Sequence, residues 1–198
     1  MDCGSTGMES KLYRLLYKEG YVNERNSKVV ESGIKRIQHL VQDIALALLA
    51  GCLMKSIGVS IVMEIIYFPL RCYSGGYHAS SDRVCKYLSW GSAVGCLVVI
   101  NFVPIPINIQ HLLIIFSVAC IMILAPVESC KKPLYDRERV IFRRRCLLVT
   151  VAVLLFYGGM VFGGVEIYAK TICISVVMVS IGVIAGRFFD QTEIRNEK

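Results

Sequence analysis

A histidine and a cysteine stand seven residues apart in a polar stretch between two apolar runs. Residues 71–85 read RCYSGGYHASSDRVC, so the pair is His78 and Cys85. A free thiol has a pKa of about 8.5, and a cysteine nucleophile therefore needs a neighbouring imidazole to ionise at neutral pH. The pair could serve as nucleophile and general base, although a single cysteine in a chain that has nine is more often inert.

The spacing of the pair constrains the local structure. On one unbroken helix, His78 and Cys85 would share a face but lie about 10 Å apart along the axis, too far to share a proton. The chain must therefore break between them. Ser80 and Ser81 are good N-cap residues and Asp82 suits a first turn, so a helix is predicted to begin there. Cys85 would then lie in or just after the first turn, where unpaired N–H groups and the helix dipole favour a thiolate.

Two glycines precede the histidine. Gly75 and Gly76 would let the loop fold back and bring His78 over the start of the following helix. A metal site made of Cys72, His78 and Cys85 is an alternative, but this spacing matches no standard metal-binding pattern. No CxxC pair occurs either. We therefore expect no metal and no cofactor.

The composition places these residues at a membrane. Hydrophobic residues make up 55% of the 198-residue chain, charged residues only 19%, and the mean hydropathy is +0.58. A soluble protein of this size could not bury so much apolar surface, and a disordered chain would lack it. The sequence predicts an all-α, polytopic integral membrane protein with about six membrane helices. The apolar stretches are 40–54, 56–70, 88–103, 112–127, 146–165 and 171–186.

The first two stretches are short and carry Asp43 and Glu64, so they predict either two short spans or a re-entrant hairpin. Residues 8–36 mix apolar and basic positions, which is typical of an amphipathic helix on the membrane surface or of a solvated tail. We expect one membrane domain over 1–198. It comprises an amphipathic cytoplasmic segment (1–39), membrane helices (40–187) and a cytoplasmic tail (188–198).

The distribution of basic residues predicts the orientation. With six crossings and both termini inside, 20 of the 22 Lys and Arg residues lie on the cytoplasmic side. The other two are Lys55 and Lys170. This asymmetry is a strong positive-inside signal. It places the loops 71–87 and 128–145 in the cytoplasm, and it explains the net charge of +7 through membrane topology and anionic lipids, without nucleic acid.

Two segments together resemble the signature of the accessory gene regulator protein B (AgrB) peptidases, over most of residues 8–190. One is the stretch that contains His78 and Cys85. The other closes the fourth apolar run and continues into a basic loop. The matching residues are Arg71, Gly75, His78, Ala79, Ser80, Ser81, Cys85, Ala125, Pro126, Val127, Lys131, Lys132, Pro133 and Leu134.

The resemblance implies a bacterial membrane cysteine endopeptidase of quorum sensing. Such enzymes cut the C-terminal part from a short AgrD-type precursor, hold the remainder as a thioester, and promote its cyclisation to a thiolactone or lactone. By the match, Cys85 would be the nucleophile and His78 the general base. Glu64, Asp82 and Asp43 are candidates for a third member that orients the imidazole.

The same match indicates the residues that bind the substrate. Seven basic residues in 128–145 satisfy topology, but they could also bind the acidic tail that family precursors commonly carry. The resemblance is also consistent with a homodimer. The residues expected to contact the precursor are Arg71, Gly75, Gly76, Ser80, Lys131 and Lys132.

Other functions remain open at the level of sequence. A small transporter or peptide exporter without a covalent step could use the same spans and an intramembrane Glu64. An acyltransferase could use Cys85, but the diagnostic Asp-His-His-Cys run is absent. A transporter should tolerate the loss of Cys85, whereas a cysteine peptidase should not.

Overall fold

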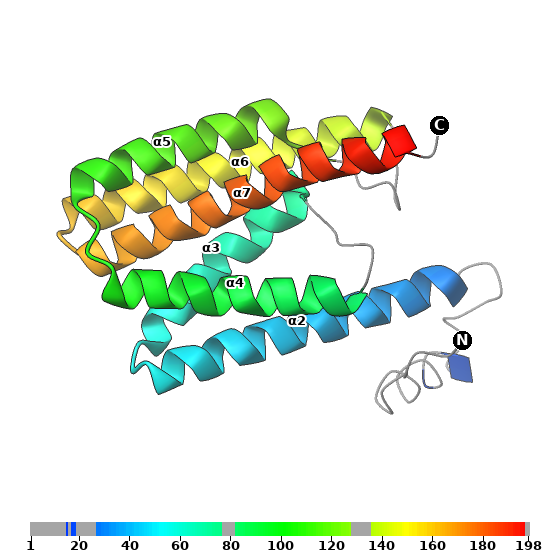
Figure 1. Cartoon of the computed structure of the whole chain (residues 1–198), viewed down its shortest axis with the longest axis horizontal. Helices are drawn as coiled ribbons and strands as arrows, with labels where there is room; N and C mark the ends of the chain where they lie inside the picture. Colours follow the sequence, from blue (N-terminus) through cyan, green and yellow to red (C-terminus); the bar gives the residue numbers. More distant parts are fainter. Residues whose placement is uncertain (1–14, 16, 19–26, 77–81, 128–135, 197–198) are drawn as a thin grey trace. The chain divides into compact units, whose positions relative to one another are not determined.

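The computed structural model describes residues 15, 17–18, 27–76, 82–127 and 136–196. These residues form helices throughout, which confirms the all-α prediction (Figure 1). The described helices are α2 (Ser27–Leu53), α3 (Ile57–Ser74), α4 (Asp82–Phe102), α5 (Ile107–Leu124), α6 (Asp136–Phe162) and α7 (Glu166–Asn196).

The chain divides into two units, residues 1–46 and 47–198. In the first unit, the described part of the predicted amphipathic segment 8–36 becomes helical where α2 begins at Ser27. Most of the rest of that segment lies outside the described residues. Asp43, one of the carboxylate candidates, belongs to the part of α2 within this unit.

Five helices, α3 to α7, are long and apolar enough to cross a membrane, and α2 contributes a shorter apolar segment, Ile37–Leu53. The second short stretch of the sequence thus lies in α3, which has 18 residues and reaches spanning length. The protein is a multi-pass membrane protein.

Helix α7 forms the core of the second unit. It contacts α3, α4, α5 and α6, and about half of its spanning segment is buried, more than in any other candidate span. Every residue from 171 to 176 is buried, so other helices enclose α7 there on all sides. Its buried apolar side chains are Ala169, Ile172, Cys173, Ile174, Val176, Val179 and Val183. By contrast, α4 packs mainly on α7 and leaves most of its apolar surface exposed, as expected of a lipid-facing helix.

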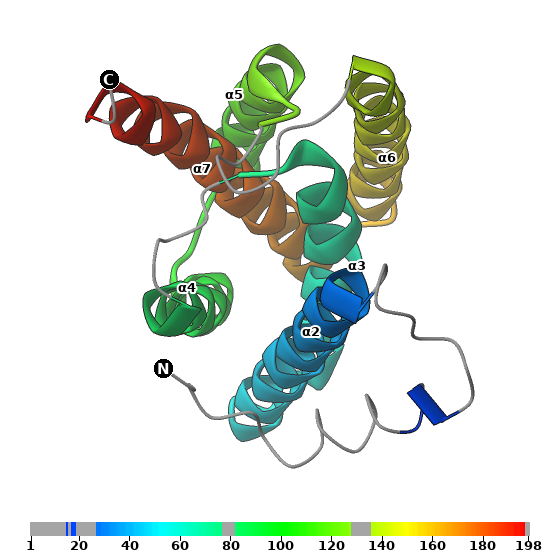
Figure 2. The same cartoon turned by 90° about the vertical axis from the view of Figure 1, so that its right-hand side faces the viewer.

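The helix ends that the charge pattern assigns to the cytoplasm lie at one end of this unit. The C-termini of α3, α5 and α7 and the N-termini of α4 and α6 are all on the right in Figure 1. Figure 2 looks onto this end. The segments that carry the candidate chemistry therefore begin and end on the same side of the bundle.

Two helices extend beyond the apolar stretches. Helix α6 begins at Asp136, so five of the seven basic residues expected in a loop at 128–145 are helical. Helix α7 continues to Asn196, through most of the segment predicted as a tail. Backbone hydrogen bonds within a helix do not require apolar side chains. A spanning helix can therefore continue into the headgroup region with charged residues in its outer turns.

Candidate functional site

The chain leaves α3 through two glycines in conformations that other residues rarely adopt. Gly75 has φ 72° and ψ −153°, and Gly76 has φ 137°. The combination at Gly75 falls in a region that is essentially restricted to glycine. These angles show a turn at the glycine pair, but the prediction that it brings His78 over the start of α4 depends on residues outside the described part.

The segment after α5 lies against this turn. Helix α5 ends at Leu124 because Pro126 drives the preceding Ala125 into an extended conformation, with φ −80° and ψ 149°. The next residue, Val127, donates its N–H to the Ser74 carbonyl at 3.0 Å and forms a parallel β-bridge with Gly75. The two segments that carry the family resemblance are therefore joined by their backbones.

Arg71, in the last turn of α3, reaches forward over the same turn. Its Nη1 donates a hydrogen bond to the Gly75 carbonyl at 2.6 Å. The guanidinium occupies the space that a side chain on Gly76 would fill, and it also lies close to Gly182 of α7. Arginine near a helix C-terminus is stabilised by the carbonyl groups there, which lack partners within the helix. Arg71 thus connects the turn to the central helix.

Aromatic and basic side chains connect α3 to the first turns of α6. The Tyr73 and Phe142 rings lie 6.1 Å apart between centroids. The Arg145 guanidinium lies 5.8 Å from the centre of the Tyr73 ring, a cation–π geometry. Arg145, in the third turn of α6, therefore lies against Tyr73, two residues before the glycine turn.

Cys85 lies in the first turns of α4, which begins at Asp82 as predicted. The side chain is half-buried, and as the fourth residue of α4 it lies at the end of the first turn, near the positive end of the helix dipole. Helix α3 ends at Ser74 and α4 starts at Asp82, so the two are separate helices. His78 lies outside the described residues, so the predicted break between His78 and Cys85 stays a prediction.

The remaining predicted site residues fall in different places. Glu64 is half-buried in α3, about 15 Å along the helix from Ser74, from the rise per residue. Asp82 is the first residue of α4, although its side chain lies outside the described part, and Asp43 belongs to the other unit. The predicted residues outside the described part are Ala79, Ser80, Ser81, Lys131, Lys132, Pro133 and Leu134. Among described side chains no metal-binding cluster occurs, but His78 belongs to the proposed metal set, which stays untested.

Another histidine, His111, is described and lies at the opposite end of the bundle (Figure 1). Its Nδ1 is hydrogen-bonded to the Tyr157 hydroxyl at 2.8 Å, with the two rings edge to face. From Cys85, α4 alone runs about 25 Å to Phe102 before α5 begins. His111 is therefore too far away to act as a base for Cys85.

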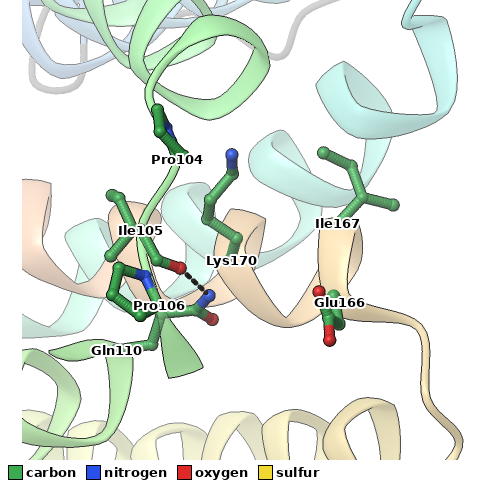
Figure 3. A pocket seen from close by; sticks show the side chains of 7 residues that line it. All are labelled: Pro104, Ile105, Pro106, Gln110, Glu166, Ile167 and Lys170. Carbon is green, nitrogen blue, oxygen red and sulfur yellow. Dashed lines mark hydrogen bonds between the residues drawn. The ribbon is translucent and has the colours of Figure 1, made fainter. Parts of the chain in front are cut away.

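The same far end has a pocket of about 670 Å³ between the α4–α5 connection and the start of α7 (Figure 3). Gln110 closes one wall by donating to the Ile105 carbonyl at 2.8 Å. Lys170 donates to the Val103 carbonyl at 3.0 Å. The lining contains no thiol, hydroxyl or imidazole, so this pocket is not a cysteine-peptidase site. It comprises Pro104, Ile105, Pro106, Gln110, Glu166, Ile167 and Lys170.

Three contributors to the site were not predicted from the sequence: the Val127 backbone, the Tyr73–Arg145 pair and Gly182. Val127 was visible only as part of the resemblance. Tyr73 and Arg145 carry no distinctive spacing. Gly182 is one glycine in an apolar helix, and its position beside Arg71 depends on how α3 packs against α7.

The fold and site together define a class of protein: an all-helical, multi-pass membrane protein with a half-buried thiol in the first turns of a helix, at the same end of the bundle as a glycine turn (Figure 1). The family model for Accessory gene regulator B matches residues 9–183. The chain belongs to the AgrB family, whose members are peptidases that process AgrD-type precursors of autoinducing peptides. No curated protein and no solved structure matches the chain.

Proposed function

We propose that the protein is a membrane cysteine endopeptidase and cyclase whose nucleophile is Cys85. It cuts the C-terminal part from an AgrD-type precursor and converts the remainder into a thiolactone or lactone. One observation carries the proposal. The backbone bridge between Gly75 and Val127 brings both family segments to the end of the bundle where α4, with Cys85 in its first turns, begins.

The proposed reaction needs no cofactor, because Cys85, His78 and the precursor supply every group that forms a bond or carries a proton. The Cys85 thiolate attacks the scissile carbonyl, and His78, which has taken the thiol proton, returns it to the leaving amine. The acyl group is then held on Cys85 as a thioester. An internal thiol or hydroxyl of the peptide attacks that thioester, closes the ring, loses its proton to His78 and releases Cys85. A thiol nucleophile suits these two reaction steps, because the thioester intermediate and the thiolactone product have similar free energies.

Either Asp82 or Glu64 could orient His78. Asp82 is the nearer candidate along the chain, three residues before Cys85 at the N-terminus of α4. Glu64 is separated from the end of α3 by almost three helical turns. We therefore assign the orienting role to Asp82 and a structural role in α3 to Glu64. The residues proposed to contact the precursor are Arg71, Gly75, Gly76 and Ser80.

We place both termini and the Cys85 end of the bundle in the cytoplasm, on the basis of the distribution of Lys and Arg. A single experiment tests orientation and chemistry together. A synthetic precursor whose internal Cys or Ser is replaced by Ala cannot cyclise, so the acyl-enzyme should accumulate. Added to inside-out vesicles, it should give a protein whose mass is increased by the N-terminal fragment, with the adduct on the Cys85 peptide.

Sealed right-side-out vesicles should give no adduct, because the precursor cannot reach the site. An adduct formed only in right-side-out vesicles would reverse the orientation. If intact precursor binds and crosses without any adduct or cleavage, the protein is a transporter and the enzymatic proposal is wrong.

Lys131 and Lys132 are proposed to bind the acidic tail of the precursor. Support comes from the neighbouring described residues: Val127 is bonded to the glycine turn, and Arg145 lies over Tyr73. Binding between exposed charges weakens with salt, because the Debye length falls from about 8 Å at physiological ionic strength to about 3 Å at 1 M.

Replacing both lysines with Gln should therefore raise KM for the precursor several-fold at low salt, with little change in kcat, as expected for the loss of uniform binding. The difference between the variant and the wild type should shrink at high salt. Steady-state cleavage by both proteins at two salt concentrations measures this difference in KM. An unchanged KM in the variant at both concentrations would restrict these lysines to a role in topology.

A further inference from the structure

Gly182 is the point at which the central helix meets the glycine turn. A Cβ built on Gly182 would lie 2.9 Å from Arg71 Nη1 and 3.5 Å from Arg71 Cζ. Real Cβ atoms essentially never lie as close as 2.9 Å to another heavy atom. A side chain at residue 182 would therefore push against the Arg71 guanidinium, whereas glycine leaves room for it. The backbones are also close, since a Cβ on Gly76 would lie 2.9 Å from the Gly182 carbonyl oxygen.

Arg71 Nη1 is the flexible end of its side chain, so a methyl group on Gly182 would displace it. The same nitrogen lies close to Gly76 and donates a hydrogen bond to the Gly75 carbonyl, so the displacement would disturb its contacts with the glycine turn. Several other glycines in the spans differ: Gly91, Gly95, Gly158 and Gly159 have no heavy atom within 4 Å of the position of an added Cβ, although Gly58 of α3 has the Tyr168 hydroxyl at 2.9 Å. Gly182 is therefore not simply one of the small residues that a membrane helix tolerates.

We propose that Gly182 is a positioning residue of the active site. Because Gly182 has no side chain, there is room beside it for the Arg71 guanidinium. Arg71 donates a hydrogen bond to the Gly75 carbonyl and so fixes the direction of the backbone that leads to His78. The inference rests on the proposed function and deepens it, because it makes α7, which contains no catalytic candidate, part of the machinery that brings His78 to Cys85.

The test is a double-mutant cycle with Gly182→Ala and Arg71→Gln, and with Gly158→Ala as the matched control. We expect Gly182→Ala to lower kcat for precursor cleavage by about 10-fold or more, with KM nearly unchanged, because small displacements of catalytic groups are costly. In the Arg71→Gln background, Gly182→Ala should have little further effect on kcat, because no guanidinium then fills the space beside residue 182. Gly158→Ala should behave like the wild type, although both changes replace a helical glycine.

A second readout needs no precursor. The rate at which iodoacetamide alkylates Cys85, followed by mass spectrometry of the Cys85 peptide, should fall in Gly182→Ala and stay at the wild-type value in Gly158→Ala.

Two results would overturn the inference. One is that Gly182→Ala behaves like Gly158→Ala in both assays. The other is that Gly182→Ala lowers kcat by the same factor in the wild type and in the Arg71→Gln background, since the two changes would then be additive. Either result leaves the proposed function intact, whereas cleavage that persists in Cys85→Ala would refute that function itself.

Discussion

Cleavage of the precursor should be lost when Cys85 is replaced by Ala, with a decrease in kcat on the order of 10³-fold or more. No other described cysteine lies in the first two turns of a helix at the end of the bundle where the glycine turn lies, and Cys146, in the third turn of α6, is buried. His78→Ala should cause a comparable loss, because the thiol then has no base to accept its proton. The double variant should be no worse than either single one, since members of a catalytic unit are not additive.

Cys72→Ala is the matched control. Cys72 is exposed near the end of α3, close to Cys85 in the sequence, and is not one of the residues that carry the family resemblance. Its replacement should leave kcat unchanged, and this result would also argue against a metal site formed by Cys72, His78 and Cys85. The measurements are single-turnover cleavage and the amount of inserted protein. Substantial cleavage by Cys85→Ala would exclude Cys85 as the nucleophile.

Gly76→Ala should be the most damaging change outside the catalytic pair. The added methyl group would overlap the Arg71 guanidinium, and the φ of 137° is unfavourable for any L residue. Backbone strain of this kind costs about 1–3 kcal/mol of stability. Displacement of Arg71 and of the chain beyond it should lower cleavage by about 100-fold.

Substitutions at two other glycines separate the effect of backbone strain on stability from the effect of Arg71 displacement on cleavage. Gly164 also has a positive φ, 70°, but an added Cβ there meets nothing within 4 Å, so Gly164→Ala should lose stability and keep cleavage per folded molecule. Gly158 has neither a positive φ nor a close neighbour, so Gly158→Ala should have the stability and kcat of the wild type. Thermal unfolding in detergent and kcat report the two quantities. If Gly76→Ala loses stability but retains full kcat, the glycine turn does not position catalytic groups.

Much of the architecture follows from local properties of the sequence. Long apolar stretches must cross the bilayer as helices, because backbone groups in lipid need partners within the same segment. The start of α4 at Asp82 follows from the serine pair and the acidic residue, and the end of α5 follows from Pro126. His78, Cys85 and the glycine pair were identifiable as residue types in one polar stretch, and the break between α3 and α4 follows from their spacing.

The tertiary structure decided which distant segments meet. The hydropathy of residues 112–127 predicts a span but carries no information on whether Val127 pairs with Gly75. Likewise, Gly182 looks like any other glycine in an apolar helix until α3 and α7 pack together with the Arg71 guanidinium between their backbones. Hydropathy and capping depend on neighbours within a few residues of the chain. Contacts such as these depend on the side-chain shapes along two whole helices, and only packing brings those shapes together.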